Sequence, residues 1–458
     1  MTINKSILLN TDSYKFSQYN QYPQGTTNVY SYVESRGGNW NQTVFFGLQI
    51  FLKEYLSKVI TQEDIDAAEL ITQAHGEPFN REGWEYILRE HGGRLPIRIK
   101  AVPEGSVIPV KNVLATVENT DPQCAWITSY IETVLLRGIW YGTTVATNSY
   151  ESKRIILDYL VKTGDPSLID FKLHDFGARG VSSFESAGIG GLAHLVNFKG
   201  TDTVTALLYG KQYYNVDVAG FSIPAMEHST VTSWGREGEV DSYRNMVKLY
   251  GKPGALFAAV SDSYNIYEAC HKWGTVLKDD VINSGATLVV RPDSGYPPEV
   301  VVKCLQILDS HYGHTVNDKG YKVLNHVRII QGDGITQDTI DRILYRAMTA
   351  EYSADNITFG QGGKLLQSID RDTQKFAMKC SSIKVNGQHR DVYKSPITDM
   401  GKESKKGRVT LYRNDEGYFT DLEGRTDAAE VLETVFENGE IVKEYTFDEV
   451  RYNASVIV

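Results

Sequence analysis

The pattern of apolar and polar positions divides the chain into three parts. In residues 1–160, alternating apolar and polar positions at 26–38 and 95–119 predict half-buried strands, with Pro and Gly marking the turns. Two short segments between them have helical spacing, and 123–163 predicts one or two long helices. This first part is therefore expected to be the N-terminal portion of a β-rich domain with helices.

The middle part, residues 161–370, repeats one unit. A strand-like apolar run ends in a polar or glycine-rich loop, and a helical pattern follows. Such alternation predicts parallel strands joined by crossover helices, most naturally closed into an α/β barrel with its active site at the carboxyl ends of the strands. An open doubly wound sheet is the competing fold, but it would gather its site at one switch point. We favour the barrel because polar residues stand at many predicted strand ends: Asp175, Arg179, Asp202, His228, Asp262, Arg291, Asp293 and Asp333.

The last part, residues 371–458, returns to short alternating strands with turn signals such as NDEG. We expect it to pack with the first part into a second domain, which both ends of the chain would then build. Its loop GKESKKGR at 401–408 is basic in an otherwise acidic chain.

Composition narrows the functional class. A net charge of −10 argues against a broad nucleic-acid surface, although it leaves room for a local basic pocket. The four cysteines lie far apart, so neither a zinc ribbon nor a disulfide scaffold is expected, and a reducing cytoplasm fits best. The first apolar run is too short for a signal peptide, and no run is long enough to span a bilayer.

Loops at three predicted strand ends have groups suited to a phosphorylated sugar. In RPDSG, the guanidinium of Arg291 suits a phosphate, and Asp293 suits sugar hydroxyls or a metal ion; a loop ion pair would explain both equally well. QGDG and FGQGG, at 331–334 and 359–363, let the backbone approach a ligand closely. Neither loop matches the P-loop or the dinucleotide fingerprint, and each is a weak signal alone.

Two further strand ends have side chains suited to a planar amide. Phe176 could stack on a ring, although core packing is the commoner role of a single Phe, and Arg179 three residues on could hold a phosphate. Asp202 could accept a hydrogen bond from a ligand amide, or it could cap the helix that follows.

His228 lies in FSIPAMEHSTVTSWG, directly after a strand-like run. It could be a structural histidine, a general base or a phosphorylation site, and structural histidines are the commonest. Its position among arginines and carboxylates at neighbouring strand ends favours phosphate chemistry. An imidazole nitrogen is a competent nucleophile when a carboxylate orients the other ring nitrogen. Asp262, at the next strand end, is the expected orienter, and the adjacent Glu227 is expected to point elsewhere.

Together these motifs resemble the nicotinamide phosphoribosyltransferases, within the type II phosphoribosyltransferase family. The likeness follows nearly the whole chain in order. It rests on LLNTDSYKFSQYNQYPQGTTNVYSYVESR, KLHDFGARGVSSFESAGIGGLAHLVNFKGTDTV, IPAMEHSTVTSWG, VSDSYNIYEAC, RPDSG, IIQGDG, FGQGGKLLQ and SKKGR.

The resemblance implies an irregular α/β barrel and a homodimer with shared active sites. It also implies that nicotinamide and 5-phosphoribosyl-1-pyrophosphate are joined into nicotinamide mononucleotide and pyrophosphate in NAD salvage. Mg²⁺ would be required, and ATP hydrolysis would be coupled through phosphorylation of His228, with Asp262 beside it.

The resemblance assigns substrate contacts residue by residue. Phe176, with Tyr14 of the second subunit, would sandwich the nicotinamide ring, and Asp202 would accept from the carboxamide. Arg179 and Arg291 would line the ring and phosphate region, and Asp293, Gly332 and Asp333 would hold the ribose. Gly362 and Gly363 would hold the 5-phosphate, and the remaining phosphates would be bound by Arg36, Arg371, Lys379 and Lys394. Metal ligands stay unassigned, and Ala178, Phe221 and Ala377 depart from the Tyr, Tyr and Ser of relatives.

Three other functions stay open at this point. Nicotinate phosphoribosyltransferase is the alternative within the family, and Asp202 argues against it because two carboxylates would meet. A barrel isomerase or aldolase would need a Schiff-base lysine or an acid–base pair at the strand ends, and Lys172 lies before its strand's polar end. A non-enzymatic binding role is the third alternative.

Overall fold

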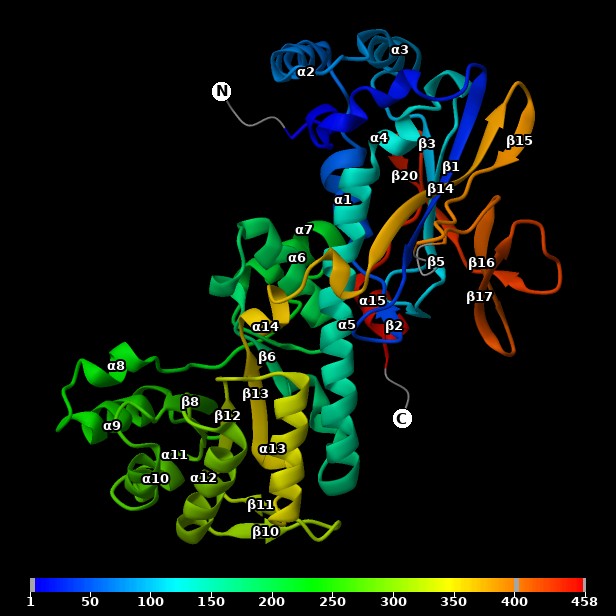
Figure 1. Cartoon of the computed structure of the whole chain (residues 1–458). Coiled ribbons are helices and arrows are strands. Elements are labelled where there is room, and N and C mark those ends of the chain that lie inside the picture. The colour runs from blue at the N-terminus through cyan, green and yellow to red at the C-terminus, as the bar shows by residue number, and fades with distance from the viewer. Residues whose placement is uncertain (1–4, 399–402, 456–458) are drawn as a thin grey trace. The chain divides into compact units, whose positions relative to one another are not determined.

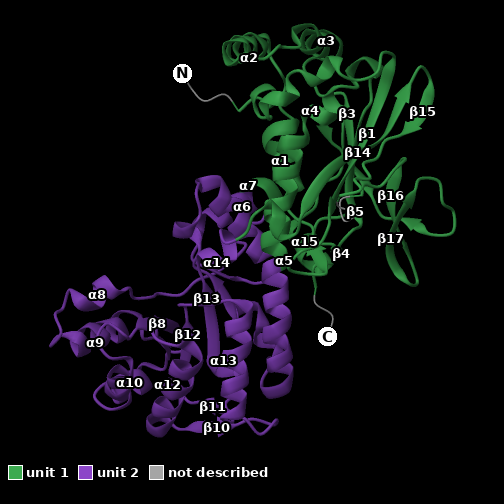
Figure 2. Cartoon of the chain, in the orientation of Figure 1, with its two compact units in different colours: residues 1–147, 212–215, 369–455 green, residues 148–211, 216–368, 456–458 purple. Residues whose placement is uncertain are grey.

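The computed structural model describes residues 5–398 and 403–455. The chain divides into two compact units (Figure 2). Unit 1 comprises residues 1–147, 212–215 and 369–455, and unit 2 comprises residues 148–211, 216–368 and 456–458. The long helix α5 (Glu132–Thr163) contributes residues to both units.

Unit 2 is built on a sheet of six parallel strands in the order β7-β6-β13-β12-β9-β8. The central strands β9 and β12 are short apolar runs rich in Val and Ile, as is typical of parallel strands buried on both faces. The strands are β6 (Leu173–Asp175), β7 (Gly200–Thr201), β8 (Leu256–Val260), β9 (Thr287–Arg291), β12 (Val327–Gln331) and β13 (Ile357–Gln361).

The segment 221–226 closes this sheet between its two edge strands. Phe221 forms an isolated parallel bridge with Gly200 of β7, and Ala225 forms one with Ala258 of β8. Pro224 lacks an N–H and cannot continue a regular ladder, so this stretch stays irregular. The parallel sheet therefore closes as an irregular barrel, which confirms the predicted fold over the open doubly wound sheet.

Helices cover the outside of the barrel strands (Figure 1). The largest buried cluster lies between strands and helices and includes Trp273, Tyr243 and Phe359. A smaller cluster faces the barrel interior, where Phe176 and Ile223 pack against Ala258, Val289 and Ile330. The helices of unit 2 are α6 (Phe184–Leu195), α7 (Val204–Tyr214), α8 (His228–Thr232), α9 (Glu239–Tyr250), α10 (Ile266–Gly274), α11 (Lys278–Ser284), α12 (Pro297–Tyr312), α13 (Gln337–Thr349) and α14 (Gly363–Leu366). Two hairpin strands, β10 (His314–Val316) and β11 (Lys322–Leu324), complete the unit.

Unit 1 is an antiparallel β-domain built from both ends of the chain, as predicted. Its main sheet has the order β15-β14-β1-β5-β3-β19-β20, and β1 pairs with β14 from Thr26↔Val385 to Ser35↔Phe376. The strands of this sheet are β1 (Thr26–Ser35), β3 (Ile97–Ala101), β5 (Val113–Asn119), β14 (Phe376–Val385), β15 (Gln388–Asp391), β19 (Glu433–Glu437) and β20 (Glu440–Ile441). Smaller sheets pair β2 (Gln42–Val44) with β4 (Val107–Pro109), and β16 (Val409–Asn414) with β17 (Gly417–Leu422) and β18 (Ala429–Glu430).

The helices of unit 1 include the predicted ones. The two short segments with helical spacing, 49–60 and 81–92, form α1 (Leu48–Phe51) continued by a π-helical turn (Leu52–Leu56), and α3 (Arg81–His91). The segment 123–163 forms α4 (Ile127–Tyr130) and α5. The other two are α2 (Gln62–His75) and α15 (Phe447–Asn453).

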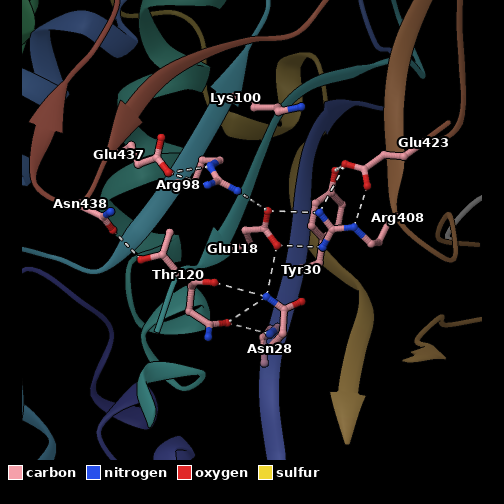
Figure 3. Close-up of polar contacts among 12 residues, drawn as sticks. Asn28, Tyr30, Arg98, Lys100, Glu118, Thr120, Arg408, Glu423, Glu437 and Asn438 are labelled. Atoms are coloured by element: carbon pink, nitrogen blue, oxygen red, sulfur yellow. Dashed lines mark hydrogen bonds and ion pairs between the residues drawn. The ribbon is translucent and has the colours of Figure 1, made fainter. Parts of the chain in front are cut away.

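Carboxylates of the sheet neutralise part of the basic loop at 401–408. Arg408 forms a forked pair with Glu118, bonds Glu423 at 2.7 Å, and lies 4.2 Å over the ring of Tyr30 (Figure 3). Lys405 donates to Glu34. Residues 401 and 402 lie outside the described range. Arg408 therefore mainly stabilises the β-domain, because bidentate guanidinium–carboxylate pairs are strong and directional.

Across the two described ranges, every helix is too short or too polar to cross a bilayer.

Candidate active site

The ring of Phe176 lies over two glycines at the carboxyl ends of the barrel strands. A Cβ at Gly360 would come within 1.9 Å of the Phe176 Cε2, and a Cβ at Gly332 within 3.3 Å. The Phe176 N–H donates to Gln361 O at 2.9 Å, which ties the loop after β6 to the end of β13. The absence of side chains at these glycines lets the aromatic ring settle across the barrel mouth.

Arg291, the last residue of β9, contacts the same ring. Its guanidinium carbon lies 5.2 Å from the Phe176 centroid, and its Nη2 donates to Asp293 Oδ1 at 3.1 Å. The Arg291 Nε is buried and has no partner among the described residues. RPDSG thus contains the expected loop ion pair between Arg291 and Asp293. The Nε donor of Arg291 remains for a ligand.

The glycine loops after β12 and β13 lie beside Phe176 and its loop. Asp333 is exposed, and its carbonyl accepts from Gln331 Nε2 at 3.0 Å. A Cβ at Gly180 would lie 3.2 Å from the Gly363 Cα, so the turn carrying Arg179 runs close to Gly363. A Cβ at Gly362 would lie 3.8 Å from the Phe176 carbonyl. These loops have the open backbone that close approach to a phosphate requires.

Asp202 follows β7, and its carboxylate is positioned by the segment 221–226. Ser222 Oγ donates to Asp202 Oδ1 at 2.6 Å. The Asp202 side chain is exposed, so the other carboxylate oxygen stays accessible. His174 lies one residue before the end of β6, and its ring occupies the space where a Cβ at Gly200 would be. Burial lowers the pKa of His174, and the charge of Asp202 opposes that shift.

His228 and Asp262 form the central polar pair of the neighbouring loops. His228 Nε2 lies 2.9 Å from Asp262 Oδ1, and Ser294 Oγ donates to Asp262 Oδ2 at 2.5 Å. The His228 side chain is 47% exposed, whereas the Asp262 side chain is 4% exposed. A buried carboxylate with both oxygens engaged therefore orients an accessible imidazole, and the Nδ1 of that imidazole is not engaged by Asp262.

The acid adjacent to His228 in sequence has other partners. Glu227 accepts from the hydroxyl of Ser229, and its N–H donates to Thr230 Oγ1 at 3.3 Å. Both contacts belong to the start of α8, so Glu227 supports the helix on which His228 stands.

Buried polar atoms without partners gather at this end of the barrel. Within the described part of unit 2, the strand-end residues and the loops directly after them contain most of the buried side-chain atoms that lack a hydrogen bond. Because such atoms are costly unless a ligand or water satisfies them, their clustering supports a polar ligand at the barrel mouth. They belong to Ser263, Arg291, Gln331 and Gln361.

Four of the expected phosphate-binding cations lie in unit 1, and three of them share one neighbourhood. Burial lowers the pKa of Lys379, and Arg36 and Arg371 lower it further while Glu132 opposes them. Lys15, which sequence reasoning missed, belongs to this group and pairs with Glu132 at 2.5 Å. The fourth, Lys394, is held separately by backbone contacts with Ser404. The ring of Tyr14 is 55% exposed, with Lys15 Nζ 5.2 Å from its centre.

Only one mixed group of metal-type donors occurs among the described residues, and it lies in unit 1. His91, Asp121 and Cys124 bring their donor atoms within 4.8 Å of one another. Asp121, however, already accepts from Gln123 N–H, Tyr86 hydroxyl and His91 Nε2. The carboxylate is thus satisfied by structural hydrogen bonds.

Sequence reasoning missed the supporting residues Ser222, Ser294 and His174, and it named Asp175 only as a polar residue at a strand end. Ser222 and Ser294 have no motif that separates them from other loop serines, since their role depends on contacts 20 and 32 residues away in sequence. His174 and Asp175 lie inside HDFG, where no spacing in the sequence marks either side chain as a support for the loop.

Comparison with known proteins places this geometry in a family. The model of the "Nicotinate phosphoribosyltransferase (NAPRTase) family" matches residues 171–440, more than half of the chain. The chain belongs to the nicotinate phosphoribosyltransferase family. A second model, "Nicotinamide phosphoribosyltransferase, N-terminal domain", matches residues 6–99.

Relatives within this family align along nearly the whole chain. A nicotinamide phosphoribosyltransferase of Xanthomonas campestris pv. campestris is 56% identical, covering 98% of this chain and 98% of its own. One of Acinetobacter baylyi is 33% identical over 96% and 95% of the two chains. One of Mycoplasma pneumoniae is 34% identical over 88% and 94%.

Two solved structures share the fold. A nicotinate-nucleotide pyrophosphorylase from Pyrococcus furiosus superposes with a TM-score of 0.65 at 16% identity, covering 99% of this chain and 96% of its own. Human nicotinic acid phosphoribosyltransferase superposes with a TM-score of 0.55 at 16% identity, covering 97% and 92%. These identities are low enough that the structures bear on the fold alone.

Proposed function

We propose that the chain is a nicotinamide phosphoribosyltransferase of NAD salvage. The observation that carries this proposal is the 56% identity to a relative of that name over 98% of both chains. The barrel-mouth site supports it, because an aromatic ring, a carboxylate, arginines and glycine loops stand together there. A planar amide and a phosphorylated sugar need those groups.

The proposed reaction is a displacement at the anomeric carbon of the ribose. The pyridine nitrogen of nicotinamide forms a bond to C1, and the bond from C1 to the pyrophosphate oxygen breaks, its electron pair leaving with pyrophosphate. No proton moves in this step. Positive charge develops on the sugar, where Asp293 can stabilise it, and negative charge develops on the leaving group, where Arg291 and the basic residues of unit 1 can.

Asp202 is proposed to read the amide group. An ionised carboxylate accepts from an –NH₂ but repels the carboxylate of nicotinate, so its chemistry favours nicotinamide. Ser222 holds one carboxylate oxygen at 2.6 Å, which leaves the other for the substrate. This arrangement favours nicotinamide over nicotinate, the alternative substrate within the family.

ATP is proposed as a co-substrate that phosphorylates His228. With Nε2 held by Asp262, the proton sits on Nε2 and the Nδ1 lone pair is the nucleophile. Nδ1 attacks the γ-phosphorus, and the bond to the leaving ADP oxygen breaks. Water later hydrolyses the phosphohistidine, which releases phosphate and restores the imidazole. The phosphate would add about −1.5 to −2 charges beside the pyrophosphate site, by analogy with other phosphorylated side chains.

Mg²⁺ is the cation that this chemistry implies, and hard oxygen donors stand where it would be needed. Asp293 and Asp333 lie in the loops directly after the neighbouring barrel strands β9 and β12, and Asp333 is exposed. Carboxylates with substrate phosphates are the usual magnesium ligands, so these two residues fit the ion better than Asp262, whose oxygens are both engaged. When bound, Mg²⁺ would neutralise charge on the leaving pyrophosphate.

A homodimer with shared active sites is proposed to bring the remaining residues to the barrel. Tyr14 of a second copy would cover the nicotinamide ring opposite Phe176. The phosphates would be bound by Arg36, Lys379 and Arg371 of the basic group in unit 1, and by Lys394. The exposed Tyr14 ring and the concentration of cations around Lys379 support this arrangement.

An aldolase-type alternative loses support from the position of Lys172. Its Nζ is buried and donates to the carbonyls of Ala354, Asp355 and Ile357 at 2.9–3.2 Å, and burial lowers its pKa to about 7. It precedes β6 and therefore lies at the opposite end of the strand from Phe176. A lysine sequestered there cannot form a Schiff base at the barrel mouth.

A direct assay tests the proposed function. The protein is mixed with nicotinamide, phosphoribosyl pyrophosphate, Mg²⁺ and ATP, and nicotinamide mononucleotide is quantified beside a parallel reaction with nicotinate. Formation of the amide nucleotide with a clear preference over the acid supports the proposal. Preference for nicotinate would identify the enzyme as the other member of the family, and absence of both products would leave a binding role.

A further inference from the structure

Asp175, the last residue of β6, has no part in the reaction described above. Its side chain is completely buried, and its Oδ1 accepts from Gly177 N–H at 2.7 Å. The residue between them is Phe176, so this bond closes a tight turn around the aromatic residue. Carboxylate-to-backbone bonds of this spacing fix loop geometry.

The main chain of Asp175 also holds the neighbouring loop. Its carbonyl accepts from Asp202 N–H at 2.9 Å, directly beside the β6–β7 pairing. One residue thus bonds the turn that positions Phe176 and the backbone of Asp202. These are the two groups proposed to bind the ring and the carboxamide of one small substrate.

Glycines make room for the carboxylate in this place. A Cβ at Gly177 would come within 2.9 Å of Asp175 Oδ1, and a Cβ at Gly191 within 3.2 Å of Oδ2. The carboxylate is buried together with the Thr203 hydroxyl. Burial raises the pKa of Asp175 to about 6, hydrogen bonds from the Thr203 side chain and from Gly177 N–H oppose that shift, and the nearby Asp202 adds to it.

We propose that Asp175 is a positioning residue that sets the spacing between the ring of Phe176 and the carboxylate of Asp202, and thereby the affinity for nicotinamide. This role rests on the proposed function. Asp175 touches no substrate in it and acts only through the two loops. Losing the Oδ1 acceptor frees the Phe176–Gly177 turn, whereas the bond to Asp202 N–H comes from the main chain and persists.

The positioning role requires the hydrogen-bond acceptor Oδ1 of Asp175 and not the charge of its carboxylate. Asp175→Asn keeps a carbonyl oxygen for Gly177 N–H, and its amide can donate to Thr203 Oγ1. Asp175→Ala removes the acceptor and leaves a buried N–H unpaired, which is the costly case. Asp165→Ala is the matched control, because Asp165 Oδ1 accepts from Ser167 N–H at 2.9 Å in another loop of unit 2.

The test measures steady-state constants for the full-length enzyme and the three variants. We expect Asp175→Ala to raise the KM for nicotinamide about tenfold, with less than a threefold change in kcat and in the KM for phosphoribosyl pyrophosphate. ATP hydrolysis without nicotinamide should be unchanged, because His228 and Asp262 stand on other loops. Asp175→Asn and Asp165→Ala should stay within threefold of wild type in every constant.

Two results in Asp175→Ala would contradict this role. An unchanged nicotinamide KM in Asp175→Ala, or an equal loss of ATP hydrolysis and transfer, overturns the positioning role. If Asp175→Ala does not fold, Asp175→Ser decides, since its shorter acceptor should still raise the nicotinamide KM, and an unchanged KM overturns the proposal. Wild-type enzyme that makes no nicotinamide mononucleotide overturns the proposed function and this role with it.

Discussion

His228 Nε2 and Asp262 Oδ1 lie 2.9 Å apart, joining residues that are 34 positions apart in sequence and stand on different barrel loops. The carboxylate is nearly fully buried and the imidazole is half exposed. This combination holds one ring nitrogen and leaves the other for chemistry.

The pair predicts which acid supports phosphorylation of His228. His228→Ala should abolish acid-labile phosphate on the protein from labelled ATP, while slow uncoupled transfer persists. Asp262→Asn should lower phosphorylation at least tenfold, because neutralising the carboxylate removes stabilisation of the imidazolium. Glu227→Gln, the adjacent-acid control, should retain it. Phosphate that survives in His228→Ala would place the acceptor elsewhere.

Ser294 should matter through Asp262. Its hydroxyl is the partner of Asp262 Oδ2, so Ser294→Ala leaves a buried carboxylate oxygen unpaired. Such a loss costs about 1–3 kcal/mol, which corresponds to roughly 5- to 150-fold in the phosphorylation rate. Ser294→Thr keeps the hydroxyl and should recover most of the rate. Rapid-quench measurement of the phosphoprotein compares Ser294→Ala with Ser294→Thr. Equal rates in both variants would show that the Ser294 hydroxyl does not act through Asp262.

Asp202 should control the choice between amide and acid. In Asp202→Asn the repulsion of nicotinate disappears, so the ratio of kcat/KM for nicotinamide to that for nicotinate should fall about tenfold. Ser222→Ala keeps the charge and loses only the bond that orients it. It should weaken nicotinamide binding while preserving the ratio. Competition between the two substrates in one reaction measures the ratio directly, and an unchanged value in Asp202→Asn contradicts this role.

Glu104 should make the stability of unit 1 depend on pH. Burial raises its pKa from 4.5 to about 7, and hydrogen bonds from Gln49 N–H and the Tyr214 hydroxyl oppose that shift only partly. Because the folded pKa exceeds the unfolded one, the contribution is fully present below about pH 4.5 and is lost as pH rises through about 7.

Glu104→Gln should therefore lose less stability than wild type between pH 5 and pH 8, by about 3 kcal/mol. Urea unfolding at both pH values, followed by tryptophan fluorescence, measures the difference. The buried His194, whose pKa burial lowers to about 3, acts in the opposite sense in both proteins, so the comparison isolates Glu104. The exposed Glu416→Gln is the control, and parallel pH profiles of Glu104→Gln and wild type would refute the assignment.

Sequence alone determined the alternation of strand and helix, and therefore the parallel barrel and the end of each strand at which polar residues stand. Periodicity and glycine-rich turns are local signals, so they survive without a structure. The order of motifs along the chain also identified the family, which the relatives confirm.

Tertiary structure decided which of those residues meet. Asp262, and not the adjacent Glu227, faces His228. The segment 221–226, which leads into His228, lies beside β8, and Asp262 follows β8. Ser222, Ser294 and Asp175 support the site through contacts that no spacing in the sequence records. Hydrogen bonds depend on distances of a few ångströms between loops far apart in the chain, and only the folded barrel fixes those distances.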